Sequence, residues 1–518
     1  MSGVLILSFS TIIVKIIGLA YKIPLMSVLG AEGMGYFNTA YEIFALLCGI
    51  STSGLPVAIS MLVSVARGKG DAAEQAGIYK ASSALLLTKG ALISSALAIF
   101  APQVAALVGN PQAYLSILAI SPSVFFCCAA GAIRGYFQGC RQMLPTAISQ
   151  LTEAFSKLGF GVGFAALALA RGASIPTAAA FAVLGVSVGS LLSAVYLCVR
   201  KWREPTSEFV KKRRGYFLPL VRISLPITLC STLVGTTRII DMTLLMQRLT
   251  DLGVSSAEAN RIYGSYTTLA LPIYGLVPAF IPPITESLIP RLSAAVSSKN
   301  GDEARRAVSN AMHLTALVCL PASLGITVYS RQIIGVLFGN EPEAIAVAAP
   351  MLSALGASVA LSCFITTSNA VLHSYGRVIL PIVALGVGAA VKAVSAYFLI
   401  GNVQVAEMGA PISTLLSNAA VLCLLLLFVR RVCGKTGLAA SLPRVTLASV
   451  ASVALSYALY APLASRLGEV PAFLLALALA VLAYIAASFV LGTMRELSYF
   501  SFKKEKVSTY FSFRKKKR

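Results

Sequence analysis

Two lysines in the first apolar stretch of the sequence are spaced so that they can act together. Lys15 and Lys22 lie seven residues apart in the segment STIIVKIIGLAYKIPLMSVLG. Seven residues make about two turns of a helix, so both ammonium groups would share one helix face. A charge at the depth of a bilayer costs roughly 2.5–3.5 kcal/mol on insertion scales. We therefore expect this face to line a cleft, where it can meet water or an anion.

Other ionisable residues also fall within apolar segments, and bases outnumber acids among them. Arg238 and Asp241 are three residues apart and can share a helix face. They form either a structural ion pair, or a site in which Arg238 contacts a substrate while Asp241 takes part in ion coupling. Glu153 and Lys157 are four apart, which favours a structural ion pair. The cations expected in the cleft are Lys15, Lys22 and Arg238, and the acids that could line it or couple to an ion are Glu42, Asp241 and Glu286.

An excess of positive charge in a membrane cleft selects an anion. Guanidinium and ammonium groups suit phosphate, and a cleft that opens sideways to lipid suits a lipid-linked pyrophosphate. We expect Lys15, Lys22 and Arg238 to hold the pyrophosphate while the polar head crosses the membrane.

The elements that position these residues are membrane helices. The chain has 518 residues, of which 57% are hydrophobic and 12% charged, whereas a soluble domain carries about 25% charged residues. The fold class is therefore an all-α polytopic membrane protein. Apolar runs of about 20 residues predict about fourteen spans, centred near residues 16, 50, 90, 123, 157, 187, 230, 277, 320, 360, 387, 419, 452 and 481.

Basic residues gather in alternate loops, as the positive-inside rule requires. This pattern places both termini in the cytoplasm and the protein in the cell membrane as a multi-pass chain. The net charge of +23 then reflects topology and contact with anionic membrane lipids, and nucleic acid is not expected as a partner.

Short motifs recur between the two halves of the chain. Gly70-Asp71 aligns with Gly301-Asp302, and the segment from Arg141 to Pro145 aligns with that from Arg377 to Pro381. Such a parallel repeat is typical of secondary transporters, whose lobes rock around a central site. Arg134, Arg141, Pro145, Arg377 and Pro381 are candidate gate or repeat elements. The predicted parts are an N-lobe with helices 1–6 (1–200), a basic cytoplasmic linker (201–214), a C-lobe with helices 7–12 (215–433), helices 13–14 (434–494) and a basic cytoplasmic tail (495–518).

Motifs of enzymes and metal sites are not found in the sequence. The ten cysteines include no CxxC pair, and there is neither a Walker A motif nor a GxGxxG motif. The segment GVSVG from Gly185 to Gly189 matches a nucleophile elbow but lies in an apolar helix without a histidine partner. We expect a transporter with no catalytic residues, no metal and no cofactor, driven by an ion gradient, the membrane potential or the substrate gradient.

Three segments resemble a known family: GLAYKIPLMSVLGAEGMGYFNTAYEIF, GLPVAISMLVS and RGYFQGCRQMLPTAISQLTEA. They are similar to the polysaccharide transporter branch of the multidrug/oligosaccharidyl-lipid/polysaccharide (MOP) flippase superfamily, especially to stage V sporulation protein B and lipid II flippase-like members. The resemblance covers nearly the whole chain. It implies fourteen helices in two lobes and export of lipid-linked cell-wall or surface-polysaccharide precursors.

The resemblance also implies roles for single residues. Lys15 takes the place of a basic residue in the first helix of lipid II flippases, whereas Tyr21 and Lys22 stand where those proteins tend to have an Arg-Asp pair. Asp241 could match an acidic residue that some members use for sodium. Lys392 stands where a further sodium ligand would be wanted, so the coupling ion, Na⁺ or H⁺, stays open.

Three functions compete at this point. The first is a flippase for undecaprenyl-pyrophosphate-linked sugars such as lipid II. The alternative is a cation-coupled multidrug antiporter on the same fold, which would need carboxylates for organic cations. The third is a membrane scaffold, for example in spore or septum assembly, against which the buried charges argue. The sequence carries no clear oligomer signal, and we expect a monomer.

Overall fold

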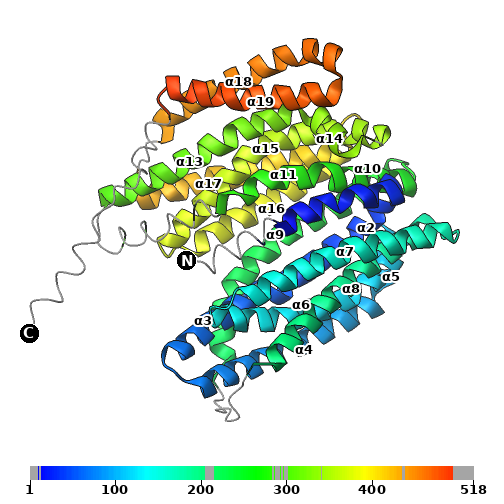
Figure 1. Ribbon diagram of the computed structural model, residues 1–518, viewed down its shortest axis with the longest axis vertical. Helices are drawn as coiled ribbons and strands as arrows, with labels where there is room; N and C mark the ends of the chain where they lie inside the picture. Colours follow the sequence, from blue (N-terminus) through cyan, green and yellow to red (C-terminus); the bar gives the residue numbers. More distant parts are fainter. Residues whose placement is uncertain are drawn as a thin grey trace, which may run out of the picture.

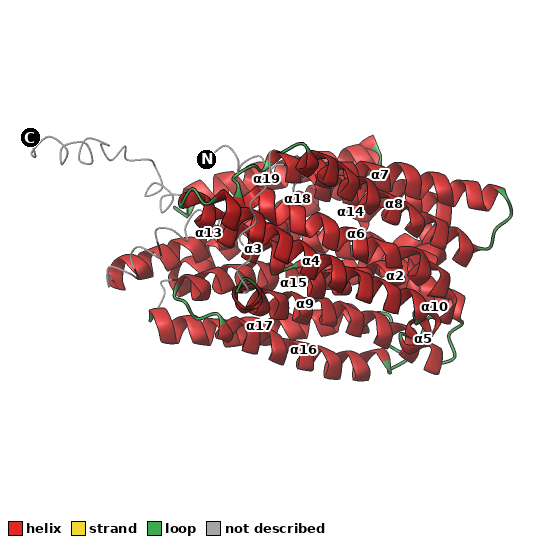
Figure 2. Ribbon diagram, turned by 90° about the horizontal axis from the view of Figure 1, so that it is seen from below, coloured by secondary structure: helices red, strands yellow, loops and turns green. Residues whose placement is uncertain are grey.

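The computed structural model describes residues 10, 13–204, 215–282, 285, 292, 296, 301–339, 341–434 and 438–493. In these ranges the regular structure is helical and includes no strand (Figures 1 and 2). Twelve helices in the described part of the chain are long and apolar enough to cross a membrane. The all-α, polytopic membrane fold expected from composition is therefore confirmed.

The two expected spans near residues 16 and 50 meet at a glycine. Residues 13–20 are helical, and α2 (Lys22–Thr52) and α3 (Leu55–Gly68) follow. Within α2 the backbone of Gly30 has φ +66° and ψ 178°, a conformation that costs little only for glycine. Gly30 thus ends the first span and lets the second begin at Ala31. With this break, the helices are consistent with fourteen spans.

The first bundle, which we call the N-lobe, contains α2 and α3 together with the helices up to α8. In it α8 packs against α6 and α7, and α6 packs against α3 and α4. The remaining helices are α4 (Ala72–Ile99), α5 (Ala101–Leu107), η1 (Pro111–Ala113), α6 (Tyr114–Gly139), α7 (Leu144–Ala170) and α8 (Ile175–Trp202).

The predicted linker starts slightly too early. Lys201 still belongs to α8 and is buried. Its ammonium lies 4.2 Å from the ring centroid of Tyr136 and 5.1 Å from that of Tyr79. Cation–π contacts of this kind stabilise a desolvated ammonium and hold the last helical turn, so the chain leaves the helix only after Trp202. The rest of the linker (205–214) and the tail (495–518) lie outside the described residues.

The second bundle, the C-lobe, runs from α9 to α17, and two further helices pack on its outer edge (Figure 1). The eighth span is composite, since α10 (Ser256–Ser265) continues through a π-helix (Tyr266–Ala270) into α11 (Leu271–Ala279). The other helices are α9 (Phe217–Asp251), α13 (Gly301–Val328), α14 (Ser330–Phe338), α15 (Pro342–Ser374), α16 (Ile379–Ile400), α17 (Gly409–Cys433), α18 (Leu438–Leu467) and α19 (Glu469–Val490).

The predicted repeat is visible in two turns, with a register that differs by one residue. After α6 the chain turns at Arg141 (φ +58°), whose N–H donates to the Gln138 carbonyl while the next N–H donates to Phe137. After α15 the same pattern is centred on Gly376 (φ +71°), and the following residue is Arg377. The structural counterpart of Arg141 is thus Gly376 and not Arg377. The alignment of the two sequence motifs paired Arg141 with Arg377 because it matched residue types and carried no information on backbone conformation.

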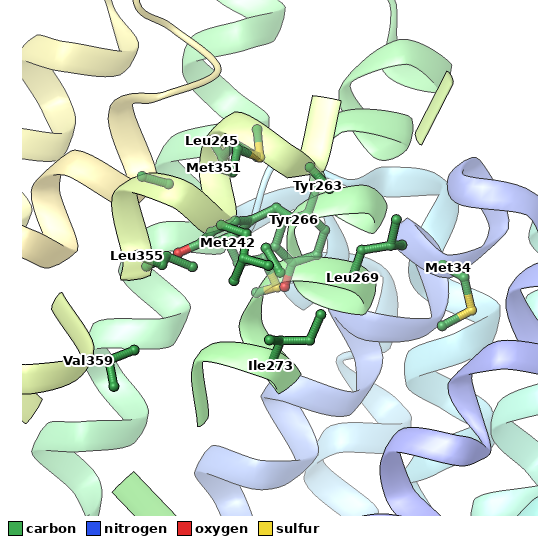
Figure 3. Close-up of a cluster of buried hydrophobic side chains, with 14 of the residues drawn as sticks. Met34, Met242, Leu245, Tyr263, Tyr266, Leu269, Ile273, Met351, Leu355 and Val359 are labelled. Atoms are coloured by element: carbon green, nitrogen blue, oxygen red, sulfur yellow. The ribbon is translucent and has the colours of Figure 1, made fainter. Parts of the chain in front are cut away.

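The helix α9 crosses from one bundle to the other. Near its start, Ser224 lies against the backbone of Gly54, and its later part packs on α16. The α2, α9, α10 and α15 helices then meet in a buried apolar cluster (Figure 3), to which they contribute Met34, Leu245, Tyr263 and Met351, respectively. This cluster fixes the two lobes relative to each other and places the polar side chains described next.

Candidate substrate site between the lobes

Four charged side chains from three helices form a central charged cluster, namely Lys22 and Glu42 of α2, Lys157 of α7 and Arg238 of α9. Lys22 interacts electrostatically with the other three. Arg238 Nη1 lies 3.6 Å from Glu42 Oε2, which joins the C-lobe to the N-lobe. Three cations and one carboxylate leave a formal charge of +2, so the cluster is suited to a doubly charged anion.

Arg238 is the most accessible of these groups. Its side chain is 55% exposed, whereas that of Glu42 is 14% exposed. A guanidinium carries five N–H donors in a planar fork, and a single 3.6 Å ion pair leaves most of them available. Arg238 can therefore bind an oxyanion while it stays close to Glu42.

Lys157 and Lys22 are held by neutral partners. Lys157 Nζ donates to the hydroxyl of Tyr41 at 3.3 Å and lies 5.0 Å from the centroid of the same ring. Lys22 Nζ donates to the backbone carbonyl of Thr267 at 2.7 Å. Neither ammonium has a carboxylate as its direct partner in these contacts, so a phosphate oxygen can replace the neutral oxygen that each one meets.

The partner of Lys22 lies in the π-helix of the eighth span. Single π-turns inside α-helices occur frequently at functional sites. The next residue, Thr268, accepts a hydrogen bond from the Asn38 amide at 2.8 Å. Two hydrogen bonds from α2 thus end on consecutive residues of one C-lobe turn.

The lobes touch directly beside this turn. The Asn110 amide donates to Asn260 Oδ1 at 2.7 Å, and Gln247 Nε2 donates to the Leu107 carbonyl at 2.9 Å. The backbones also approach so closely that a Cβ on Gly35 or Gly264 would collide with the opposite helix. We call this end of the molecule, which carries Asn110, the Asn110 end. The two lobes are packed against each other there.

A second ion pair lies inside the C-lobe. Lys392 Nζ of α16 lies 2.7 Å from Asp241 Oδ2 of α9, and both side chains are only 7% exposed. The same ammonium donates to Thr414 Oγ1 of α17 at 3.0 Å. The alternative of an Arg238–Asp241 pair is therefore wrong. The two residues are three apart, but Arg238 turns toward the N-lobe and Asp241 into the C-lobe core.

The expected pair between Glu153 and Lys157 is likewise replaced. Glu153 Oε2 accepts from Arg134 Nη2 at 3.1 Å. Arg134 also donates to Ser149 and Ser193, so it ties α6, α7 and α8 together within the N-lobe. Arg134, a candidate gate or repeat element, thus makes these contacts within the N-lobe.

The remaining candidate residues are distributed as follows. Lys15 is exposed and makes no ion pair with another described residue; it precedes Lys22 by two turns on the same face. Glu286 lies outside the described residues. Arg141, Pro145, Arg377 and Pro381 lie in or directly after the two repeat turns, away from the cluster. The described residues hold no group of three or more His, Cys, Asp or Glu side chains that could bind a metal ion.

Sequence reasoning missed three members of the site. Lys157 was assigned to Glu153, and neither Tyr41 nor the carbonyl of Thr267 carries a signal that composition or spacing reveals. An ionisable residue four positions from an opposite charge looks paired on a helical wheel. Only the arrangement of α6, α7 and α2 decides which partner it takes.

The comparisons with known proteins agree with this architecture. The family model of polysaccharide biosynthesis proteins matches residues 1–296. The model of the lipid II flippase MurJ matches residues 263–478. Among solved structures, the lipid II flippase MurJ in an inward closed conformation superposes with a TM-score of 0.71 at 15% identity, covering 95% of this chain and 99% of its own. An inward-facing MATE family multidrug resistance transporter of the MOP superfamily gives 0.69 at 14% identity, with 84% and 99% covered.

Three proteins of Bacillus subtilis (strain 168) are similar in sequence. The membrane protein YabM is 28% identical over 81% of this chain and 78% of its own length. Stage V sporulation protein B is 27% identical over 67% and 68%, and the lipid II flippase MurJ is 24% identical over 83% and 82%. These families are transporters and not enzymes. The chain belongs to the polysaccharide biosynthesis protein family and is a multi-pass membrane flippase or transporter.

Proposed function

We propose that the protein carries a lipid-linked anionic glycan, such as an undecaprenyl-pyrophosphate-linked peptidoglycan precursor like lipid II, across the cytoplasmic membrane by alternating access. The observation that carries this proposal is the central charged cluster, where three cations meet one carboxylate between the two lobes. Guanidinium and ammonium groups are the side chains that suit phosphate.

Each cation has a distinct part in this proposal. Arg238 offers its free donors to the pyrophosphate, and Lys22 and Lys157 exchange neutral protein oxygens for phosphate oxygens. Lys15, exposed two turns before Lys22, is an additional contact on the path to the cluster. The closed Asn110 end blocks one exit, so the lobes must separate there before the head group can leave.

The distribution of basic residues between the two ends supports a direction of transport. Arg67 and Arg200 in the last turns of α3 and α8, and Arg141 and Arg377 in the two repeat turns, lie at the end opposite Asn110. We assign this end to the cytoplasm by the positive-inside rule. The precursor then enters from the cytoplasm and is released at the Asn110 end. No partner subunit is needed for this cycle, so the proposed functional unit is a monomer.

The test is transport of fluorescently labelled lipid II in vesicles that contain the purified chain. Lys22→Gln and Arg238→Gln are expected to lower the rate by about tenfold or more, since hydrogen bonds to charged groups contribute about 1.5–3 kcal/mol each. Lys80→Gln is the matched control, because Lys80 is an exposed lysine of α4. Equal rates for all three variants would refute the proposal.

The same vesicles distinguish the multidrug antiporter. If the wild-type chain exports a cationic dye and moves no labelled lipid II, the antiporter is correct and the cluster has another role. If it moves neither, a scaffold function gains support. Transport of lipid II that depends on Lys22 and Arg238, without dye export, is the result that the flippase predicts.

A further inference from the structure

An apolar groove runs along the outside of the C-lobe between α9 and α16. It has a volume of about 520 Å³. Four lining residues come from α9 and four from α16, and together they are Ile239, Ile240, Thr243, Leu244, Ala393, Val394, Tyr397 and Phe398. The transport cycle proposed above makes no use of this groove.

The groove opens toward the membrane and not toward the central charged cluster. Both helices are long and apolar enough to span a bilayer. Val394, Tyr397 and Phe398 are exposed, and their side chains have no charge. On α9, Ile239 and Ile240 directly follow Arg238 but point to other faces, because successive residues turn by about 100°. A hydrocarbon chain is the occupant that this lining accepts.

A cation lies at one end of the groove. Arg248, near the end of α9, places its guanidinium 4.3 Å from the ring centroid of Tyr397. Its Nη1 lies 3.3 Å from Asp251, whose side chain is 62% exposed. Its Nε is buried and has no hydrogen-bond partner. The aromatic ring and one exposed carboxylate hold the guanidinium, while donors remain unused.

An apolar groove that ends at a cation matches a lipid with an anionic head. From Ile239 to Arg248 the helix rises about 13 Å, at 1.5 Å per residue, which is the length scale of an acyl chain within one leaflet. Each buried methylene adds about 0.8 kcal/mol. A zwitterionic head would gain less from a lone guanidinium, because it brings its own positive charge to the same place.

We propose that this groove, which we call the α9–α16 groove, binds one anionic phospholipid from the leaflet at the Asn110 end. The acyl chain lies along Ile240, Leu244 and Val394, and the phosphate contacts Arg248. The lipid packs on the helix that carries Arg238 and Asp241, so it stabilises the C-lobe side of the substrate site.

The experiment uses the full-length chain in detergent, with dioleoylphosphatidylglycerol and dioleoylphosphatidylcholine as probes. Bound lipid is counted by native mass spectrometry, and the apparent affinity follows from titration. The wild-type protein should bind phosphatidylglycerol more tightly, by about tenfold, the factor that 1.4 kcal/mol of charge-assisted contact provides. Arg248→Gln should remove this preference. Arg466→Gln, which changes an exposed arginine near the end of α18, should keep it.

Two further measurements keep the proposal testable if Arg248→Gln fails to fold. Ala393→Phe should fill the groove and weaken binding of both lipids. A phosphatidylglycerol with a photoreactive acyl chain should label peptides that contain residues 239–244 and 393–398 of the wild-type chain. Equal affinity for both lipids, or labelling only at other helices, would overturn the proposal. Transport of lipid II by the Lys22→Gln and Arg238→Gln variants is a separate readout, so either proposal can fail alone.

Discussion

The ion pair between Lys392 and Asp241 offers the most quantitative perturbation. Both side chains are 7% exposed and the charged atoms are 2.7 Å apart. With an effective dielectric constant of about 20, their attraction is roughly 6 kcal/mol, most of which offsets the loss of hydration. Lys392→Met removes the cation and leaves a buried carboxylate without a counter-charge. Breaking such a pair from one side costs about 3–5 kcal/mol.

The cost should largely disappear when both partners are neutral. Lys392→Met combined with Asp241→Asn leaves no buried charge, and replacing a whole buried pair is often neutral or stabilising. The assay is the midpoint of thermal unfolding in detergent for the wild type, both single variants and the double variant, treated as a double-mutant cycle. Lys80→Met serves as the control for loss of an exposed lysine.

Two outcomes would refute this reasoning. The first is a Lys392→Met variant as stable as the Lys80→Met control, which would mean that the carboxylate does not need its counter-charge. The second is a double variant no more stable than the single ones, which would mean that the two charges do not act as a pair.

Three further predictions concern ion use, closure and the repeat turns. We expect transport to change by less than about twofold when choline replaces sodium, because the Lys392 ammonium already compensates Asp241; a loss of transport without sodium would contradict this. Gly264→Ala should slow transport by about tenfold, because its Cβ would meet the backbone of Ala31 and prevent the lobes from closing at the Asn110 end. Gly163→Ala is the control, because open space surrounds Gly163. Equal transport rates for the two variants would exclude a need for this closure. Gly376→Ala should lower the unfolding free energy by about 1 kcal/mol through its φ of +71° alone, and an unchanged unfolding midpoint would refute that reasoning.

The sequence predicts the fold better than it predicts the site. Apolar runs of span length follow directly from the absence of water in the bilayer, so the helices and the class could be read without coordinates. Which side chains meet could not be read in this way. Asp241 forms an ion pair with Lys392, which lies 151 positions away in the sequence, and Arg238 forms one with Glu42 on the other lobe.

The cases of Lys22 and Lys15 show where sequence reasoning ends. Both lysines share a helix face, as expected, but within the described part of the chain only Lys22 reaches a partner between the lobes. The π-helix that supplies its carbonyl partner has no sequence signal that we recognised. A helical wheel gives the direction of a side chain, whereas the crossing of α2, α9 and α10 gives its distance from a partner.

The most direct test of the account is a pair of opposite shifts in the affinity for undecaprenyl pyrophosphate, measured on the purified chain by native mass spectrometry. Glu42→Gln removes the one carboxylate of the central charged cluster and frees Arg238, so binding should tighten severalfold. Lys22→Gln should weaken binding by about tenfold. If Glu42→Gln instead weakens binding, or if neither variant changes it, the cluster does not hold the anionic head and the central claim is contradicted.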